Sequence, residues 1–142
     1  MAIRLGMEAK LLYKAGGQAG GGSWTVLGNA RDVTLNLEAG EADVTTRANS
    51  GWRATVATLK EASVEFEMVW DTADAGFTAI KNAFFQNAPI GLQILDETAG
   101  QGLQADFSIT NFSRNEALEE AITVSVTAKV TYSATAPSWI GG

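Results

Sequence analysis

The stretch ITVSVTAKVTY, residues 122–132, alternates apolar and polar side chains along its whole length. Successive side chains of a β-strand point to opposite faces of a sheet, so this alternation gathers the apolar side chains on one face. The stretch therefore predicts a strand with one buried and one solvated face. The apolar positions are Ile122, Val124, Val126, Ala128, Val130 and Tyr132, and the polar positions are Thr123, Ser125, Thr127, Lys129 and Thr131.

Similar alternation predicts further strands elsewhere in the chain. The longer ones cover residues 32–38, 63–70 and 103–109, and shorter strands are expected at residues 9–14 and 89–96. After Ile109 the phase slips, because the next apolar side chain of the pattern is Phe112. A bulge or a strand end near Asn111 would account for this slip. We also expect a turn at EAGE, residues 38–41, before alternation resumes.

One segment has helical rather than alternating spacing. Its sequence is TADAGFTAIKNAFFQNAP, with apolar side chains three or four positions apart at Phe77, Ile80 and Phe84. We expect a helix over residues 72–87, capped at its start by Asp71 or Thr72. Asp74 would then lie in the first turn, where the helix dipole favours a carboxylate. One amphipathic helix beside antiparallel strands predicts a mainly β fold, an antiparallel β-sandwich or barrel with one flanking α-helix.

The length of 142 residues fits one domain with one core. We expect a β-sandwich domain over residues 1–133 and an extended C-terminal arm over residues 134–142. The arm sequence, ATAPSWIGG, is too short and too broken for a core element, but it carries Trp139 and Ile140. Near the other end of the chain, AGGQAGGGS, residues 15–23, has the composition of a flexible loop.

The composition narrows the possible chemistry. The chain contains no cysteine and no histidine, which excludes disulfides, thiolate or imidazole metal sites and the Ser–His and Cys–His nucleophile pairs. We therefore expect no enzyme activity, no catalytic residues, no metal site and no cofactor. A net charge of −6 makes the chain a poor binder of nucleic acid phosphate. We expect no membrane association, since no apolar run could span a bilayer and the segment MAIRLGMEAK lacks the apolar stretch of a secretory signal.

Three features leave other interpretations open. The glycine-rich loop lacks the lysine that a phosphate-binding P-loop requires. Glu65 and Glu67 lie two positions apart on a predicted strand, a separation of about 6–7 Å that approaches the spacing of a glycosidase pair. A carboxylate hydrolase is therefore one alternative. Asp71, Asp74 and Asp96 suggest a calcium site, but the spacing of an EF-hand is absent.

The segment EADVTTRANSGWRATV is long and polar, yet it places Trp52 among turn-forming residues and between Arg47 and Arg53. We expect a long interface loop or hairpin over residues 40–58. Ordering a wet loop costs about 1–2 kcal/mol per residue in backbone entropy, so such a loop is either mobile alone or ordered by a partner. Tryptophan and arginine are common anchors of interfaces. The alternative is that Trp52 folds back onto its own sheet.

An acidic cluster just before the last long strand offers a charge partner for these arginines on a neighbouring copy. The alternative is a solvated turn. The residues that we expect at contacts between subunits or between rings of subunits are Arg47, Asn49, Trp52, Arg53, Glu116, Glu119, Glu120, Trp139 and Ile140.

Three motifs stand in order along nearly the whole chain, after an opening GMEAKLLYKAGG. They are DVTLNLEAGEADVTTRANSGWR at residues 32–53, VEFEMVWDTAD at residues 64–74 and FSRNEALEE at residues 112–120. In their order and spacing these motifs resemble those of the major tail tube proteins of long-tailed bacteriophages, whose fold is similar to that of the type VI secretion tube protein. None of the motifs is a catalytic signature.

The resemblance implies that six copies form a ring and that rings stack into a hollow tube around a tape-measure protein. Tail terminator and baseplate proteins would be further partners, and DNA would pass through the lumen without specific binding. The resemblance also implies a location in the virion tail, after assembly in the host bacterial cytoplasm.

A polar, negatively charged bore would repel phosphate, so DNA would slide through it rather than bind. The residues that we expect to face the lumen are Glu65, Glu67, Asp106, Thr123, Ser125 and Thr127. The alternative function is a β-sandwich adhesin or carbohydrate-binding module, which would display exposed aromatic side chains on one rigid face.

Overall fold

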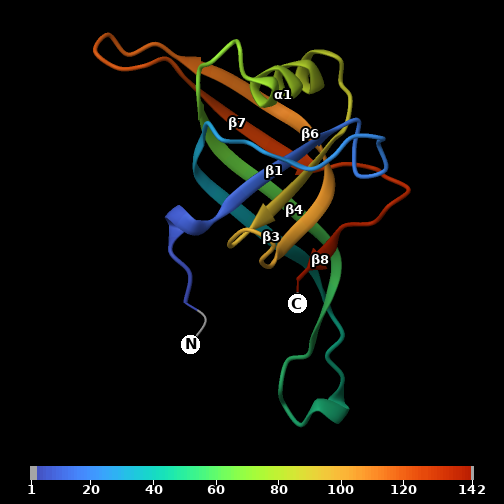
Figure 1. The fold of residues 1–142 in the computed structure, drawn as a ribbon. Coiled ribbons are helices and arrows are strands. Elements are labelled where there is room, and N and C mark those ends of the chain that lie inside the picture. Colours follow the sequence, from blue (N-terminus) through green and yellow to red (C-terminus); the bar gives the residue numbers. More distant parts are fainter. Residues whose placement is uncertain (1–2, 142) are drawn as a thin grey trace.

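The computed structural model describes residues 3–141, and in this part of the chain eight strands form one antiparallel sheet. The strand order is β2-β1-β5-β6-β7-β4-β3, with β8 paired to β6. The sheet curls into a half-barrel and α1 covers one end of it (Figure 1), which confirms a mainly β fold with one flanking helix. The elements are β1 Lys10–Ala15, β2 Thr25–Val26, β3 Ala30–Asp43, β4 Thr55–Val69, α1 Ala75–Phe85, β5 Ile90–Leu95, β6 Gly102–Asn115, β7 Thr123–Val130 and β8 Ser138–Ile140.

The most strictly alternating stretch forms β7, which lies between β6 and β4 in the sheet. Its apolar side chains Val124, Val126 and Ala128 are at most 1% exposed. Tyr132 lies beyond the end of β7 and is exposed, so it takes no part in the core. The predicted phase slip is confirmed, because the pairing of β6 with β7 shifts register between Ile109 and Asn111.

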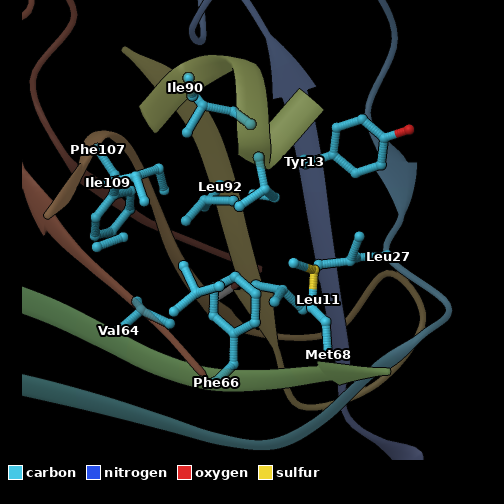
Figure 2. Packing of buried hydrophobic residues seen from close by; sticks show 14 of the residues in the cluster. Leu11, Tyr13, Leu27, Val64, Phe66, Met68, Ile90, Leu92, Phe107 and Ile109 are labelled. Atoms are coloured by element: carbon cyan, nitrogen blue, oxygen red, sulfur yellow. The ribbon is translucent and has the colours of Figure 1, made fainter. Parts of the chain in front are cut away.

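The core fills the concave side of the curled sheet. Figure 2 shows side chains of β1, β4, β5 and β6 converging beneath α1. Full burial of one large apolar side chain contributes about 1.5–3 kcal/mol, so this cluster is the main source of stability. The largest fully buried side chains are Phe107, Met68, Ile80, Ile90, Leu92, Val64, Val124 and Val126.

The helix is shorter than the expected span of residues 72–87. It runs over Ala75–Phe85, and its N-cap is Asp74 rather than Asp71 or Thr72. The Asp74 carboxylate accepts a hydrogen bond from the Phe77 backbone N–H at 2.9 Å. This carboxylate satisfies one of the backbone donors that a helix start leaves unpaired.

The expected turn at residues 38–41 is absent, because β3 continues through it to Asp43. The pairing with β4 shifts register between Ala39 and Glu41, so Gly40 lies at a bulge. A Cβ atom at Gly40 would lie 2.6 Å from Thr58 Oγ1, so a larger residue there would require the Thr58 side chain to move. Because a bulge absorbs an extra residue without ending a strand, the hairpin can continue past the core.

Because Phe107 is fully buried in the core, its replacement should have a large effect on the stability of the fold. Replacing Phe107 with alanine leaves a cavity and should lower the free energy of unfolding by about 3–5 kcal/mol. Urea denaturation followed by circular dichroism measures this change. Leu118, which is 99% exposed, is the control, and Leu118→Ala should change the free energy of unfolding by less than about 0.5 kcal/mol. Equal losses in both variants would contradict the core described above.

Candidate interaction surfaces

The β3–β4 hairpin ends in a compact tip, which we define as residues 44–54. It contains one short helical turn, Arg47–Asn49. Ser50 and Gly51 then reverse the chain with φ values of 53° and 84°. Trp52 follows this reversal and is 78% exposed. The alternative that Trp52 folds back onto its own sheet is therefore wrong.

Hydrogen bonds close the base of the hairpin tip. The Asp43 Oδ1 atom accepts from the backbone N–H of Thr45 at 2.9 Å and from its hydroxyl at 2.5 Å. The Thr45 Oγ1 atom in turn accepts from the Ala54 backbone N–H at 2.8 Å, across the two arms of the hairpin. The hydroxyl and then the backbone N–H of Thr45 hold the pKa of Asp43 below its usual value of 3.8. The tip is thus held by local contacts.

The hairpin tip has a shallow, open hollow of about 540 Å³ on its surface. Its wall includes the indole of Trp52 and the two arginines, Arg47 and Arg53. Neither arginine forms an ion pair within residues 3–141. One aromatic side chain between two cations that form no ion pair within the described residues suits an acidic segment that also carries an apolar side chain.

The acidic cluster lies in the loop between β6 and β7, at the end of the molecule opposite the hairpin tip (Figure 1). Glu116, Glu119 and Glu120 are all exposed. Leu118 in the same loop is 99% exposed. Glu116 is 3.2 Å from the Arg114 Nε atom, an ion pair that leaves the other two glutamates free within the part of the chain described.

A continuous polar face covers the convex side of β3, β4 and β7. Glu65 lies between Thr34 and Thr127 in the strand register. Glu67 lies between Arg31 and Ser125, and its carboxylate is 3.9 Å from the Arg31 guanidinium. Thr123 extends the same face beside Val69. Five of the six residues expected to face a lumen therefore share one surface.

Asp106 is the exception, because it is 6% exposed. Its side chain points to the same side of β6 as the polar face, but the loop of residues 15–23 covers it. The backbone N–H of Gln18 donates to Asp106 Oδ1 at 2.6 Å. Asp106 therefore does not line the polar face, and Gln18, which sequence reasoning missed, is itself buried.

The expected C-terminal arm contains β8, which pairs with β6 of its own subunit. Trp139 lies opposite Leu103, and Ile140 lies opposite Gly102. The Trp139 Nε1–H donates to Gln101 Oε1 at 3.1 Å, yet the residue stays 56% exposed. An aromatic surface thus remains available beside the sheet.

Within residues 3–141 no helix is both long enough and apolar enough to cross a membrane. The same residues contain no group of three or more acidic side chains arranged to hold a metal ion. The calcium interpretation of the aspartates therefore finds no support in the geometry.

Comparison with known proteins agrees with the resemblance seen in the motifs. Residues 8–135 match the family model described as phage tail tube protein. A search of curated proteins returns no match.

Solved structures of phage-like tails share the fold. The tail of an empty gene transfer agent particle, computed with helical refinement in C6 symmetry, is 20% identical with a TM-score of 0.76, covering 96% of this chain and 98% of the other. The SPP1 tail tube is 17% identical with a TM-score of 0.76, covering 99% and 80%. The baseplate of the anti-feeding prophage is 6% identical with a TM-score of 0.64, covering 99% and 97%.

The hydrogen bonds of Asp43 predict that the hairpin tip loosens in acid. A lowered pKa means that the ionised carboxylate stabilises the folded tip above pH 3.8, and that this contribution is lost as the pH falls through the lower folded pKa. The NMR shift of the Thr45 amide should therefore titrate below pH 3.8. In Asp43→Asn the same amide should show no such transition, and an identical titration in both proteins would contradict the assignment.

Proposed function

The chain belongs to the phage tail tube protein family, and from this premise we propose that six copies close into a ring and that rings stack into a hollow tube that conducts DNA to the host. A structural role in the phage tail follows from the family. The similar gene transfer agent tail was refined in C6 symmetry, which supports six copies per ring. The observation that carries the proposal is the long unpaired edge of β3.

Strand β3 is 14 residues long and lies at one end of the sheet, with β4 as its neighbour. An exposed edge of this length is a template for pairing with another chain. A second free edge lies at the other border of the polar face, on β6. Residues 110–115 of β6 pair with β7 on one side and with none of the described strands on the other. Pairing β3 of one copy with this part of β6 in the next copy would remove both edges, as closure does in a barrel.

This ring closure would join the polar faces of the copies into one wall. The wall would carry Glu65, Glu67, Thr123, Ser125 and Thr127, and the subunit has a net charge of −6. A wall of short polar side chains on an acidic subunit, with Glu65 and Glu67 balancing the cations Arg31 and Lys129, gives phosphate no excess of positive charge to bind. We therefore assign this face to the bore, through which DNA passes without specific binding.

Stacking of rings would use the two ends of the subunit. Arg47 and Arg53 lie at one end and the acidic β6–β7 loop lies at the other, so a head-to-tail contact brings opposite charges together (Figure 1). Such a heterologous contact repeats without limit, as a tube requires. The hollow beside Trp52 would receive Leu118, and Asn49, Trp139 and Ile140 would add contacts between subunits.

Further partners belong to the same proposal. A tape-measure protein would occupy the bore before DNA does, and tail terminator and baseplate proteins would bind the two ends of the tube. The tube would assemble in the host bacterial cytoplasm and function in the virion tail. Negative-stain microscopy of the concentrated pure protein tests the central claim, since rings or hollow rods are expected and single small particles at every concentration would contradict it.

The charge pairing between rings predicts that reversal at one end abolishes stacking. Arg47→Glu with Arg53→Glu should prevent tube formation, because like charges would then meet across the contact. Adding Glu119→Lys and Glu120→Lys to the same chain should restore tubes. Sedimentation and negative-stain microscopy measure both results. Lys81→Glu on α1 is the charge control and should assemble normally, whereas failure of the fourfold variant to recover would contradict this pairing.

The assignment of the bore predicts tubes that retain DNA when the charge of the polar face is reversed. Glu65→Lys with Glu67→Lys should still assemble, since both side chains point away from the core, but the tubes should bind linear DNA at low salt. Binding should weaken steeply as salt rises. The neutral pair Glu65→Gln with Glu67→Gln is the control and should bind little. DNA binding that does not differ between the two pairs would place these residues outside the bore.

A further inference from the structure

Asp106 is a buried carboxylate that the polar face does not use. Its Oδ1 atom accepts the Gln18 backbone N–H at 2.6 Å, and its Oδ2 atom accepts the Ser133 hydroxyl and, at 3.4 Å, the Gln18 side-chain amide. No cation pairs with Asp106 within residues 3–141. The carboxylate thus joins two segments that are far apart in sequence, the loop of residues 15–23 and the start of the C-terminal arm.

The loop is shaped to reach this carboxylate. Gly17 has a φ of 94°, and a Cβ atom there would lie 2.8 Å from Asp106 Oδ1. A Cβ atom at Gly91, on the strand beneath, would lie 2.9 Å from the Trp24 ring and 3.1 Å from the Gln18 backbone nitrogen. Two glycines therefore allow the loop to lie directly against the sheet. Although its composition predicts a flexible loop, its centre is fitted to Asp106.

The start of the arm is fitted to the same carboxylate. Ser133 Oγ, which donates to Asp106, also accepts the Thr135 backbone N–H at 3.1 Å. The Thr135 carbonyl accepts the Gln18 side-chain amide at 3.2 Å. Gln104, which lies opposite Ser138 of β8, donates to Gln18 Oε1 at 3.0 Å. The hydrogen bonds therefore connect the loop, the start of the arm and the strand on which the arm ends.

Burial of a carboxylate without a cation costs free energy that its hydrogen bonds must offset. An apolar residue at this point of β6, facing apolar side chains of the loop and the arm, would avoid that cost. A carboxylate, by contrast, sets the direction of each group that donates to it. The geometry is therefore better explained by positioning than by stability.

We propose that Asp106 is the positioning residue of the C-terminal arm. Through Gln18 and Ser133 it sets the path by which residues 134–137 reach β8, and so it places Trp139 for contact with a second copy of this chain. The inference rests on the proposed function in one respect, the use of the arm in assembly. The connection between Asp106 and the arm is independent of that function and is measurable in the unassembled subunit.

The test compares Asp106→Asn and Ser133→Ala with the unmodified protein. Asp106→Asn keeps the shape but removes an acceptor, and Ser133→Ala removes the bond from Ser133 to Asp106 together with the acceptor of the Thr135 N–H. Hydrogen exchange of unassembled protein should become about tenfold faster or more at the amides by which β8, Ser138–Ile140, pairs with β6 in both variants, because a hydrogen bond to a charged group is lost. Exchange in β4 and β7 should not change.

Asp71→Asn is the matched control, since Asp71 also accepts a backbone N–H, from Ala73 at 3.0 Å, but lies before α1. In Asp71→Asn the backbone amides of the arm should exchange at the same rate as in the unmodified protein. Unchanged exchange of the arm in both Asp106→Asn and Ser133→Ala would overturn the proposal, as would equal acceleration in Asp71→Asn.

Tube formation is then measured separately by negative-stain microscopy. Both arm variants should fail to form tubes at a concentration at which the unmodified protein forms them. Normal tubes with a loosened arm would overturn the role of Asp106 in assembly. If the unmodified protein forms no tubes, the proposed function fails, while the exchange measurement still decides whether Asp106 positions the arm.

Discussion

The pairing of β4 with β7 is the interaction on which the rest of the structure depends. It places Val64, Phe66 and Met68 in the core and Glu65 and Glu67 on the opposite face. A shift of one residue would exchange these two sets and bury the glutamates. The same ladder therefore fixes the core, the polar face and the direction in which the hairpin tip projects.

The lengths of the strands explain why some apolar side chains stay exposed in the isolated subunit. Strands β3 and β4 contain 14 and 15 residues, whereas β1 and β5 contain six each. Only one end of the long pair covers the core, so Leu37 and Leu59 on the other end are 54% and 85% exposed. An isolated subunit gains little from such an extension, but a chain that pairs with copies of itself can bury it.

Much of the fold could be predicted because alternation is a local property. The buried residues of β7, the bulge after Ile109 and the helix near Phe77 all follow from spacing along the chain. The expected turn at residues 38–41 was wrong, because glycine serves a bulge as well as a turn. At the candidate interaction surfaces, the spacing of Glu65 and Glu67 was enough to predict that they share one face. The sequence did not decide whether Trp52 is exposed or folds back onto its own sheet.

The sequence by itself determined which side of each strand an amino acid faces, since the two-residue period of a strand requires no partner to be known. Only the tertiary structure decided what covers that side. Asp106 shows the difference, because its alternation matches a solvated face while a distant loop buries it through Gln18. Coverage depends on segments that meet through space, and the hydrogen bonds that join residues 18, 106 and 133 leave no periodic signal along the chain.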